Sequence, residues 1–511
     1  MGIAADECYI AKVKFIKSGQ AMLFWLYVTT LFAAARPDVL MIAIDDLRPM
    51  LGCYGDRHIQ TPNIDRLAAR SQVFERAYCQ VAKCGPSRLS LMTGLRPDAI
   101  GVMGHRKKEV DGFRNRRPDA TSLARWLKDH GYATRSFGKV DHDGWQVESD
   151  WSAPPFAGRD GEMLEIADET NPAGPSIIAE RWQCPVMQSP DVEDAYFFAG
   201  RMTQEVIHTL RRAKANKPLF LAVGYRRPHL PFVAPKRYYD LYQPDRSWLA
   251  TNPEPPVGSP VMAWFNSDGY VGGARRANLT MPNPPNREEG IAWNGYEMRS
   301  YLGVPNQGEI DTDLQLRLRH AYAACISYVD AQIGKVLDEL ERTDRIKDMV
   351  IILWSDHGWH LGEHSAWGKM TNFEIATRVP LMIAAPDLKP GRIDALAELV
   401  DIYPTLCELI NLEPPPHLEG ESLLDAGPSS SIACSQYERF GGKFIGHALR
   451  TPQYRFVVWT EQKSGRVTER ELYDHATDPN ETHNLVSDPA YSQRIAQLSE
   501  RHRIAFEQAA K

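Results

Sequence analysis

The feature that most constrains the fold of this chain is a series of short, continuous apolar runs separated by segments with helical periodicity. The runs occupy residues 37–45, 132–138, 219–225, 349–355 and 379–385. Strands that are buried on both faces have continuous apolar sequences, whereas strands with one solvent-exposed face alternate between apolar and polar residues. The pattern therefore predicts an α/β fold in which helices sandwich a large, mostly parallel sheet.

Residues 311–342 place apolar side chains at steps of three and four, which predicts one long amphipathic helix with a buried stripe. Two other stretches, 145–191 and 243–306, are rich in Pro, Gly and Asn and show no clear period. We expect both to be surface excursions, which is where substrate specificity often lies.

The C-terminal part of the chain has a different pattern. From about Ser431 it contains short strand-like runs, and a helical tail begins near Ala490. A length of 511 residues corresponds to about three structural units at ~150 residues each. The pattern instead favours a large α/β domain over residues 36–425 and a smaller α+β subdomain over 426–511, with the boundary in the Pro/Gly/Ser-rich stretch 413–430.

The N-terminus has the arrangement of a secretory signal. Lys12, Lys14 and Lys17 precede an apolar run over 21–35 that ends in small residues. That run is shorter than the ~20 residues that a membrane span needs. We therefore expect a signal peptide over 1–35, although Met22 is an alternative start, and an exported product (periplasmic, secreted or in a lysosome-like compartment) without stable membrane association.

Composition excludes several classes of function. Lys+Arg 59 against Asp+Glu 65 gives a formal net charge of -6, which argues against the broad basic surface of a nucleic-acid-binding protein. Eight cysteines are too few for a disulfide scaffold, and the absence of a CxxC pair argues against a cysteine zinc site.

Polar clusters follow two of the expected strands. Asp45 and Asp46 end the first apolar run, and Asp356 and His357 end the fourth. Taken alone, two acids after a strand are usually a helix cap or a solvated loop. If the two strand ends meet, however, three carboxylates gather, and their mutual repulsion calls for a cation. Oxygen ligands indicate Ca²⁺ or Mg²⁺. His357 is either a further ligand of the metal or a hydrogen-bond partner of one of the ligands.

Between these clusters lies the string Cys84-Gly-Pro-Ser-Arg88, followed by Leu89-Ser-Leu-Met-Thr-Gly94. Pro86 suits a first helical position, so Cys84 is expected at a helix N-terminus, although a lone cysteine there is often only a small buried residue. The complete string resembles the signature of the type I sulfatases, C-x-P-S-R followed by x-x-x-[LM]-T-G. That resemblance implies an alkaline-phosphatase-like fold and the oxidation of Cys84 to Cα-formylglycine by a maturation enzyme.

Four further segments, 44–56, 138–142, 224–232 and 355–364, are similar to the iduronate-2-sulfatase branch of that family. Asp141 departs from the branch, where an aromatic residue is commoner. In family members a cysteine in the position of Cys184 can join a disulfide, but no cysteine stands between Cys84 and Cys184, so we expect that bridge to be absent.

The resemblance also implies a site. One Ca²⁺ per chain, with Mg²⁺ less expected, would be held by Asp45, Asp46, Cys84, Asp356 and His357. The implied catalytic residues are Cys84, Arg88, Lys139, His142, His229 and Lys369. In this scheme the hydrated aldehyde attacks sulfur, the two lysines hold the sulfate oxygens and Arg88 holds the formylglycine. One histidine protonates the leaving oxygen and the other assists the nucleophile, and the sequence does not say which.

Four residues are candidates for binding the sugar. Arg48 could meet a uronate carboxylate and Glu363 the sugar hydroxyls. Trp359 and Trp367 could each cover a sugar ring or simply pack in the core, and both interpretations stay open.

Together these features predict an exo-acting sulfatase that removes a 2-O-sulfate from a uronic acid residue of a sulfated glycosaminoglycan or other sulfated polysaccharide. One alternative is a phosphate or phosphonate monoester hydrolase on the same scaffold. The other is a sulfated-glycan-binding protein whose cysteine is never matured.

Overall fold

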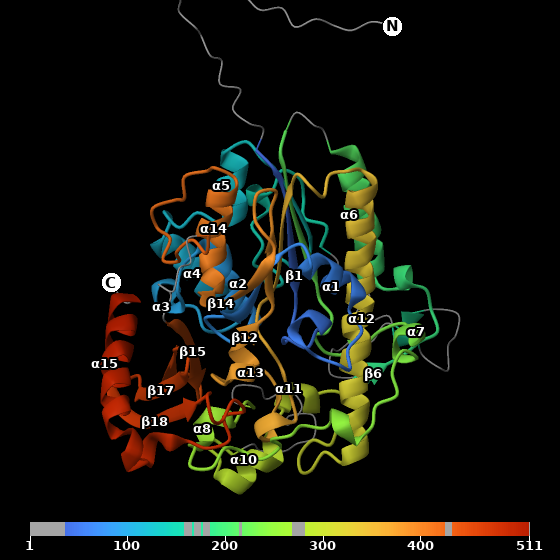
Figure 1. Ribbon diagram of the computed structural model, residues 1–511. Helices are drawn as coiled ribbons and strands as arrows, with labels where there is room; N and C mark the ends of the chain where they lie inside the picture. The colour runs from blue at the N-terminus through green and yellow to red at the C-terminus, as the bar shows by residue number, and fades with distance from the viewer. Residues whose placement is uncertain are drawn as a thin grey trace, which may run out of the picture. The chain divides into compact units, whose positions relative to one another are not determined.

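The computed structural model describes residues 36–157, 166–167, 175–176, 184–213, 217–267, 282–424 and 432–509 (Figure 1). The predicted signal peptide and parts of both excursions lie outside these ranges. Residues Arg36–Lys511 form one compact unit. In the described part of the chain, no helix is both long and apolar enough to cross a membrane.

A central eight-stranded sheet has the order β12-β2-β13-β9-β1-β7-β3, with β14 paired to β2. Its strands are β1 (Asp38–Ile44), β2 (Gln72–Tyr78), β3 (Ala133–Gly138), β7 (Leu219–Tyr225), β9 (Met349–Ser355), β12 (Arg378–Val379), β13 (Leu381–Ala384) and β14 (Gly391–Glu398). The neighbours β3, β7, β1 and β9 are all parallel, so their carboxyl ends meet at one edge.

Helices cover both faces of this sheet, which is why its central strands are apolar throughout. On one side lie α1 (Pro62–Ala68), α6 (Phe198–Arg212) and α12 (Thr312–Arg342), and on the other α2 (Cys84–Thr93), α5 (Leu123–Asp129) and α14 (Ile402–Leu409) (Figure 1). Leu40 and Ile42 of β1 pack into the first core, and Val39 and Met41 pack into the second. The predicted α/β sandwich is confirmed, and α12 begins directly after Asp311, whose carboxylate accepts from Leu314 N at 2.8 Å.

The sheet is less uniformly parallel than the apolar runs indicate. The run 379–385 is split at Pro380 into β12 and β13, and β13 is antiparallel to both β9 and β2. Strands β2 and β14 were not predicted, because charged residues such as Glu75, Arg76 and Arg392 interrupt their apolar pattern.

The C-terminal segment forms a four-stranded antiparallel sheet followed by a helix. Its elements are β15 (Ala433–Arg439), β16 (Phe444–Arg450), β17 (Tyr454–Glu461), β18 (Arg466–Asp474) and α15 (Ser492–Ala509). This agrees with the expected short strands and helical tail. The boundary at residue 425 stays a prediction.

The excursion 243–306 is not only a surface feature. Its described part contains α8 (Val261–Trp264), α10 (Arg287–Trp293) and α11 (Tyr296–Arg299). Trp264 and Trp293 are buried in a cluster that also includes Phe373 and Trp459. The excursion therefore packs between the two sheets, and α11 contributes a side chain to the site described next.

Candidate active site

The strands β1 and β9 bring two acidic pairs together. Ile44 lies opposite Ser355 in the parallel register, so Asp45–Asp46 and Asp356–His357 leave the sheet side by side. Asp46 N donates to Asp356 Oδ1 at 3.2 Å across this junction. Asp46 has a positive φ of 61°, a conformation that Asp tolerates better than most residues, and the turn directs its carboxylate towards α2. The sheet therefore creates the predicted gathering of three carboxylates.

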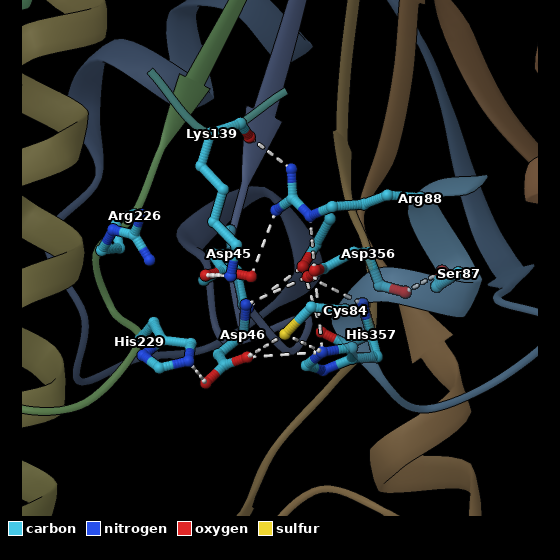
Figure 2. A network of polar contacts seen from close by, with 12 residues as sticks. Asp45, Asp46, Cys84, Ser87, Arg88, Lys139, Arg226, His229, Asp356 and His357 are labelled. Atoms are coloured by element: carbon cyan, nitrogen blue, oxygen red, sulfur yellow. Dashed lines mark hydrogen bonds and ion pairs between the residues drawn. The ribbon is translucent and has the colours of Figure 1, made fainter. Parts of the chain in front are cut away.

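Helix α2 places Cys84 against these acids (Figure 2). Cys84 is the first helical residue and Pro86 the third, not the first, a position that still lacks a helical partner for its missing N–H. Ser87 Oγ donates to the carbonyl oxygen of Asp356 at 2.6 Å and fixes the helix to the end of β9. The Cys84 Sγ lies 3.2 Å from His357 Nε2 and 3.8 Å from Asp46 Oδ1.

The donor set suits a hard divalent cation. Ligand atoms of Asp45, Cys84, Asp356 and His357 lie within 4.8 Å of one another, and a second such group joins Asp45, Asp46 and Cys84 to His229. Asp46 Oδ2 is buried and makes no hydrogen bond. Burial, together with the neighbouring negative charge of Asp45, raises the pKa of Asp46 well above its usual range despite Lys369. A buried carboxylate oxygen without a donor, among other acids, is what a cation would relieve.

Two cations from other segments neutralise part of this charge. Arg88 is fully buried, and its Nε donates to Asp356 Oδ2 at 2.8 Å while a terminal nitrogen donates to Asp45 Oδ1 at 3.2 Å. Lys139, just beyond β3, forms an ion pair with Asp45 (Figure 2). Although burial opposes them, Lys139 and Arg88 hold the pKa of Asp45 well below its usual range.

A third cation, Lys369, contacts Cys84 directly. Lys369 Nζ lies 2.7 Å from Asp46 Oδ1 and 3.2 Å from Cys84 Sγ. His229 Nε2 is 4.0 Å from Asp46 Oδ2, so Asp46 lies between His229 and Cys84 (Figure 2). A fourth carboxylate, Glu297 of α11, is 3.6 Å from both Lys369 Nζ and His229 Nε2. Glu297 was not predicted from the sequence, because it lies in a segment without a motif or a periodic pattern.

His142 belongs to an aromatic stack at the start of α2. Its ring stacks on His105 with centroids 4.1 Å apart, and Trp145 lies edge-on to it. His105 Nε2 accepts from Gly85 N at 3.4 Å, which connects the stack to the residue after Cys84. Burial, reinforced by the positive charge of Lys139, lowers the pKa of His142 to about 3. His105 was not predicted as a site residue from the sequence, because its contact with His142 forms only when these two segments meet in the folded chain.

The four sugar-binding candidates lie around a buried ion pair. Arg48 donates to Glu363 Oε1 at 2.9 Å, and Arg319 of α12 donates to the same oxygen at 2.6 Å. Despite burial, these two cations hold the pKa of Glu363 well below its usual range. Trp359 is fully buried with Lys369 Nζ 5.1 Å from its ring centroid, and Trp367 is 5% exposed. For Trp359 this geometry favours core packing over contact with a sugar ring.

The chain is similar to known proteins over most of its length. A family model described as Sulfatase matches residues 37–412, and one described as N-sulphoglucosamine sulphohydrolase, C-terminal, matches 362–508. The chain is 31% identical to the iduronate 2-sulfatase of Homo sapiens, over 88% of this chain and 91% of that protein.

Two solved structures show the same fold at lower identity. A phosphonate monoester hydrolase of Agrobacterium radiobacter superposes with a TM-score of 0.68 at 21% identity, covering 93% of this chain and 96% of its own. A 2-O GAG sulfatase superposes with a TM-score of 0.64 at 20% identity, covering 93% and 92%.

Proposed function

The chain belongs to the sulfatase family and is a sulfuric ester hydrolase, and we propose that it removes a 2-O-sulfate from the terminal uronic acid of a sulfated polysaccharide. The observation that carries this proposal is the buried cluster in which Cys84 meets three acids and Lys369. We further propose that the protein is exported through the signal over residues 1–35.

Asp45, Asp46 and Asp356 are the oxygen ligands that would hold a Ca²⁺ ion, together with position 84 and His357. Ca²⁺ suits a site built from several chain segments better than Mg²⁺, which demands near-ideal octahedral geometry and keeps several waters. When bound, the cation would stabilise negative charge on sulfate oxygens and favour deprotonation of a hydroxyl at position 84.

The nucleophile would derive from Cys84 after oxidation to formylglycine by a maturation enzyme. The aldehyde supplies a hydrate hydroxyl as nucleophile and a route for releasing sulfate. The surrounding residues favour such a group over the thiol. Burial and the charge of Asp45 raise the pKa of the Cys84 thiol to about 11, so the unmodified side chain is a neutral thiol at physiological pH.

The remaining cations of the cluster would bind and orient the ester. Lys369 contacts Cys84, and Lys139 pairs with the neighbouring Asp45; both would hold the non-bridging sulfate oxygens, where negative charge grows during cleavage. Arg88 donates hydrogen bonds to Asp45 and Asp356 and would keep these two metal ligands in place.

The two histidines differ in their surroundings. His229 faces the carboxylates of Asp46 and Glu297, which suits a side chain that donates a proton to the leaving sugar oxygen. Burial and the charge of Lys139 lower the pKa of His142 to about 3, so His142 is neutral at physiological pH and cannot supply the proton. We assign proton donation to His229, and His142 would assist the nucleophile as a neutral hydrogen-bonding imidazole.

Support for the sugar comes from the human iduronate 2-sulfatase, which is 31% identical over most of both chains. Arg48 would meet the uronate carboxylate. Because Arg48 already contacts Glu363, uronate would share this guanidinium with an existing partner. Trp367 and Glu363 would form the wall beside it, whereas Trp359 packs in the core.

The proposal is tested with the matured protein and defined uronate-containing disaccharides carrying either 2-O- or 6-O-sulfate. Release of sulfate from the 2-O-sulfated terminal unit, and not from the 6-O isomer, is the expected result. Faster cleavage of an aryl phosphate than of the matching aryl sulfate would identify a phosphate or phosphonate ester hydrolase. Mass spectrometry across Cys84 in protein from its native source should show formylglycine, and an intact thiol without turnover would indicate a binding protein.

A further inference from the structure

Glu297 is a buried carboxylate that the proposed mechanism does not require. It is 6% exposed, and its two oxygens lie 3.6 Å from His229 Nε2 and 3.6 Å from Lys369 Nζ. Lys369 in turn contacts Cys84 Sγ at 3.2 Å. Glu297 is therefore one side chain away from the nucleophile position, on the side where His229 would meet the leaving oxygen.

The fold holds this carboxylate firmly. Gly295, which precedes α11, has a φ of +80°, and a Cβ there would come within 2.8 Å of Trp367. The Gly295 N–H donates to Asn266 Oδ1 at 2.9 Å. Arg299, at the end of the same helix, donates to the carbonyl oxygens of Asn294, Pro305 and Gly308 at 2.6 to 3.0 Å. These contacts fix α11, so the position of Glu297 is built into the fold.

A fixed carboxylate at this place is unfavourable for an anionic ester. Like charges a few ångströms apart repel each other, and burial leaves that repulsion only weakly screened. Lys369 offsets part of that repulsion, but Lys369 is also shared with Asp46 and Cys84. A carboxylate next to the leaving oxygen is favourable if the substrate presents a hydrogen-bond donor there. On a sugar, that donor is the hydroxyl on the carbon next to the sulfated carbon.

We infer that Glu297 accepts a hydrogen bond from the hydroxyl adjacent to the sulfate ester and thereby selects substrates in which that hydroxyl is free. A second sulfate, or a carboxylate, at the adjacent position would face Glu297 and be rejected by like charge. This inference rests on the proposed function, because it places the ester between Lys369 and His229. It adds a specificity-determining residue to that site.

The test compares two pairs of substrates in wild-type and Glu297→Gln protein. One pair is a 2-O-sulfated uronoside with a free 3-hydroxyl and its 3-deoxy analogue. The other pair, 2-hydroxyphenyl and 2-methoxyphenyl sulfate, does not depend on the identity of the sugar. The expected result is that Glu297→Gln lowers the ratio of kcat/KM within each pair by about 10-fold, because a charge-assisted hydrogen bond becomes a neutral one.

Wild-type protein should also cleave catechol bis-sulfate, with its adjacent second sulfate, at least ~10-fold more slowly than 2-hydroxyphenyl sulfate. This measurement needs no variant and decides the question even if Glu297→Gln fails to fold. Glu288→Gln, the same change at an exposed position of α10, is the matched control and should leave all ratios unchanged.

If Glu297→Gln lowers kcat/KM equally for both members of each pair, Glu297 acts only through His229 and Lys369, and the inference is wrong. Equal wild-type rates on the bis-sulfate and the monosulfate overturn it as well. If wild-type protein cleaves no sulfate ester, the proposed function itself has failed, which is a separate and recognisable outcome.

Discussion

Cys84 lies at the centre of a cluster in which each neighbour comes from a different segment of the chain. Its sulfur contacts His357 beyond β9 and Lys369 beyond β11 (Trp367–Gly368), each at 3.2 Å. Both neighbours are almost completely buried, so their side chains have little conformational freedom. The chemistry of position 84 is consequently set by its surroundings more than by the residue alone.

Replacing Cys84 by Ala should lower the turnover rate by at least ~10³-fold, because the nucleophile is lost while its supporting residues remain. The free energy of unfolding should change little, since one sulfur atom is removed. Sulfate release and urea unfolding measure the two effects. Cys407→Ala, a buried cysteine of α14 far from the cluster in sequence, controls for the packing loss. Substantial activity in Cys84→Ala would contradict the assigned nucleophile.

At the scale of elements, the edge formed by β1 and β9 positions the acids, and α2 positions Cys84 against them. The parallel sheet and its polar strand ends were predictable, because buried strands leave an apolar signature and the acids follow it directly. Strands β2 and β14 were not predictable, because their charged residues interrupt the apolar pattern and pair with each other across the two strands, as Arg392 does with Glu75. The contribution of α11 was also unpredictable, since its position depends on packing of Trp264 and Trp293.

The C-terminal sheet contains a buried acid that makes its stability depend on pH. Glu471 of β18 accepts from Trp459 Nε1 at 2.7 Å and from Tyr473 OH at 2.6 Å, and burial raises its pKa from 4.5 to about 7. The folded state therefore binds this proton more tightly than the unfolded state. Its contribution to stability is complete below pH 4.5 and is lost as pH rises to about 7.

Glu471→Gln should remove that dependence. Between pH 5 and pH 8 the free energy of unfolding of the wild type should fall by about 2 to 3 kcal/mol more than that of the variant. Urea unfolding at the two pH values measures the difference. Glu469→Gln, on the same strand but exposed, should behave as the wild type does. Parallel pH profiles for wild type and Glu471→Gln would show that Glu471 is already ionised at pH 5.

At the scale of the whole molecule, residues 36–511 form one compact unit that shares its site among distant segments. Motifs pointed to most of the residues that the fold gathers around Cys84, but not to the partners of these residues. Arg48 is an example, because Glu363 follows it by 315 residues and Arg319 completes the pair from α12. Neither contact leaves a periodic signal in the sequence. Only the structure shows that the guanidinium of Arg48 already contacts Glu363.

Removing divalent cations should destabilise the whole protein as well as inactivate it. EGTA removes the divalent cation, whose positive charge balances the carboxylates of Asp45, Asp46 and Asp356. Calcium at about 100 times its Kd should restore roughly 2.7 kcal/mol of stability. Calorimetry with EGTA and with added Ca²⁺ checks this, and Asp356→Asn should reduce the difference. Identical unfolding curves in both conditions would exclude a resident cation.

Exported protein should begin at Arg36. The small residues Ala33 and Ala35 before it fit the cleavage site of a signal peptide. N-terminal sequencing of protein from the culture medium or periplasm checks this boundary. A product that keeps residues 21–35, or one retained in the cytoplasm, would contradict the predicted signal peptide.

The burial of Cys84 sets a time limit on its maturation. The thiol is 1% exposed once Asp356, His357 and Lys369 pack over it, and Lys369 is made 285 residues after Cys84. At a synthesis rate of about 5 to 20 residues per second, the cysteine stays uncovered for roughly 15 to 60 seconds. A modifying enzyme must reach it in that interval or on an unfolded chain. Slower translation should therefore raise the active fraction of the protein, and rapid folding should lower it.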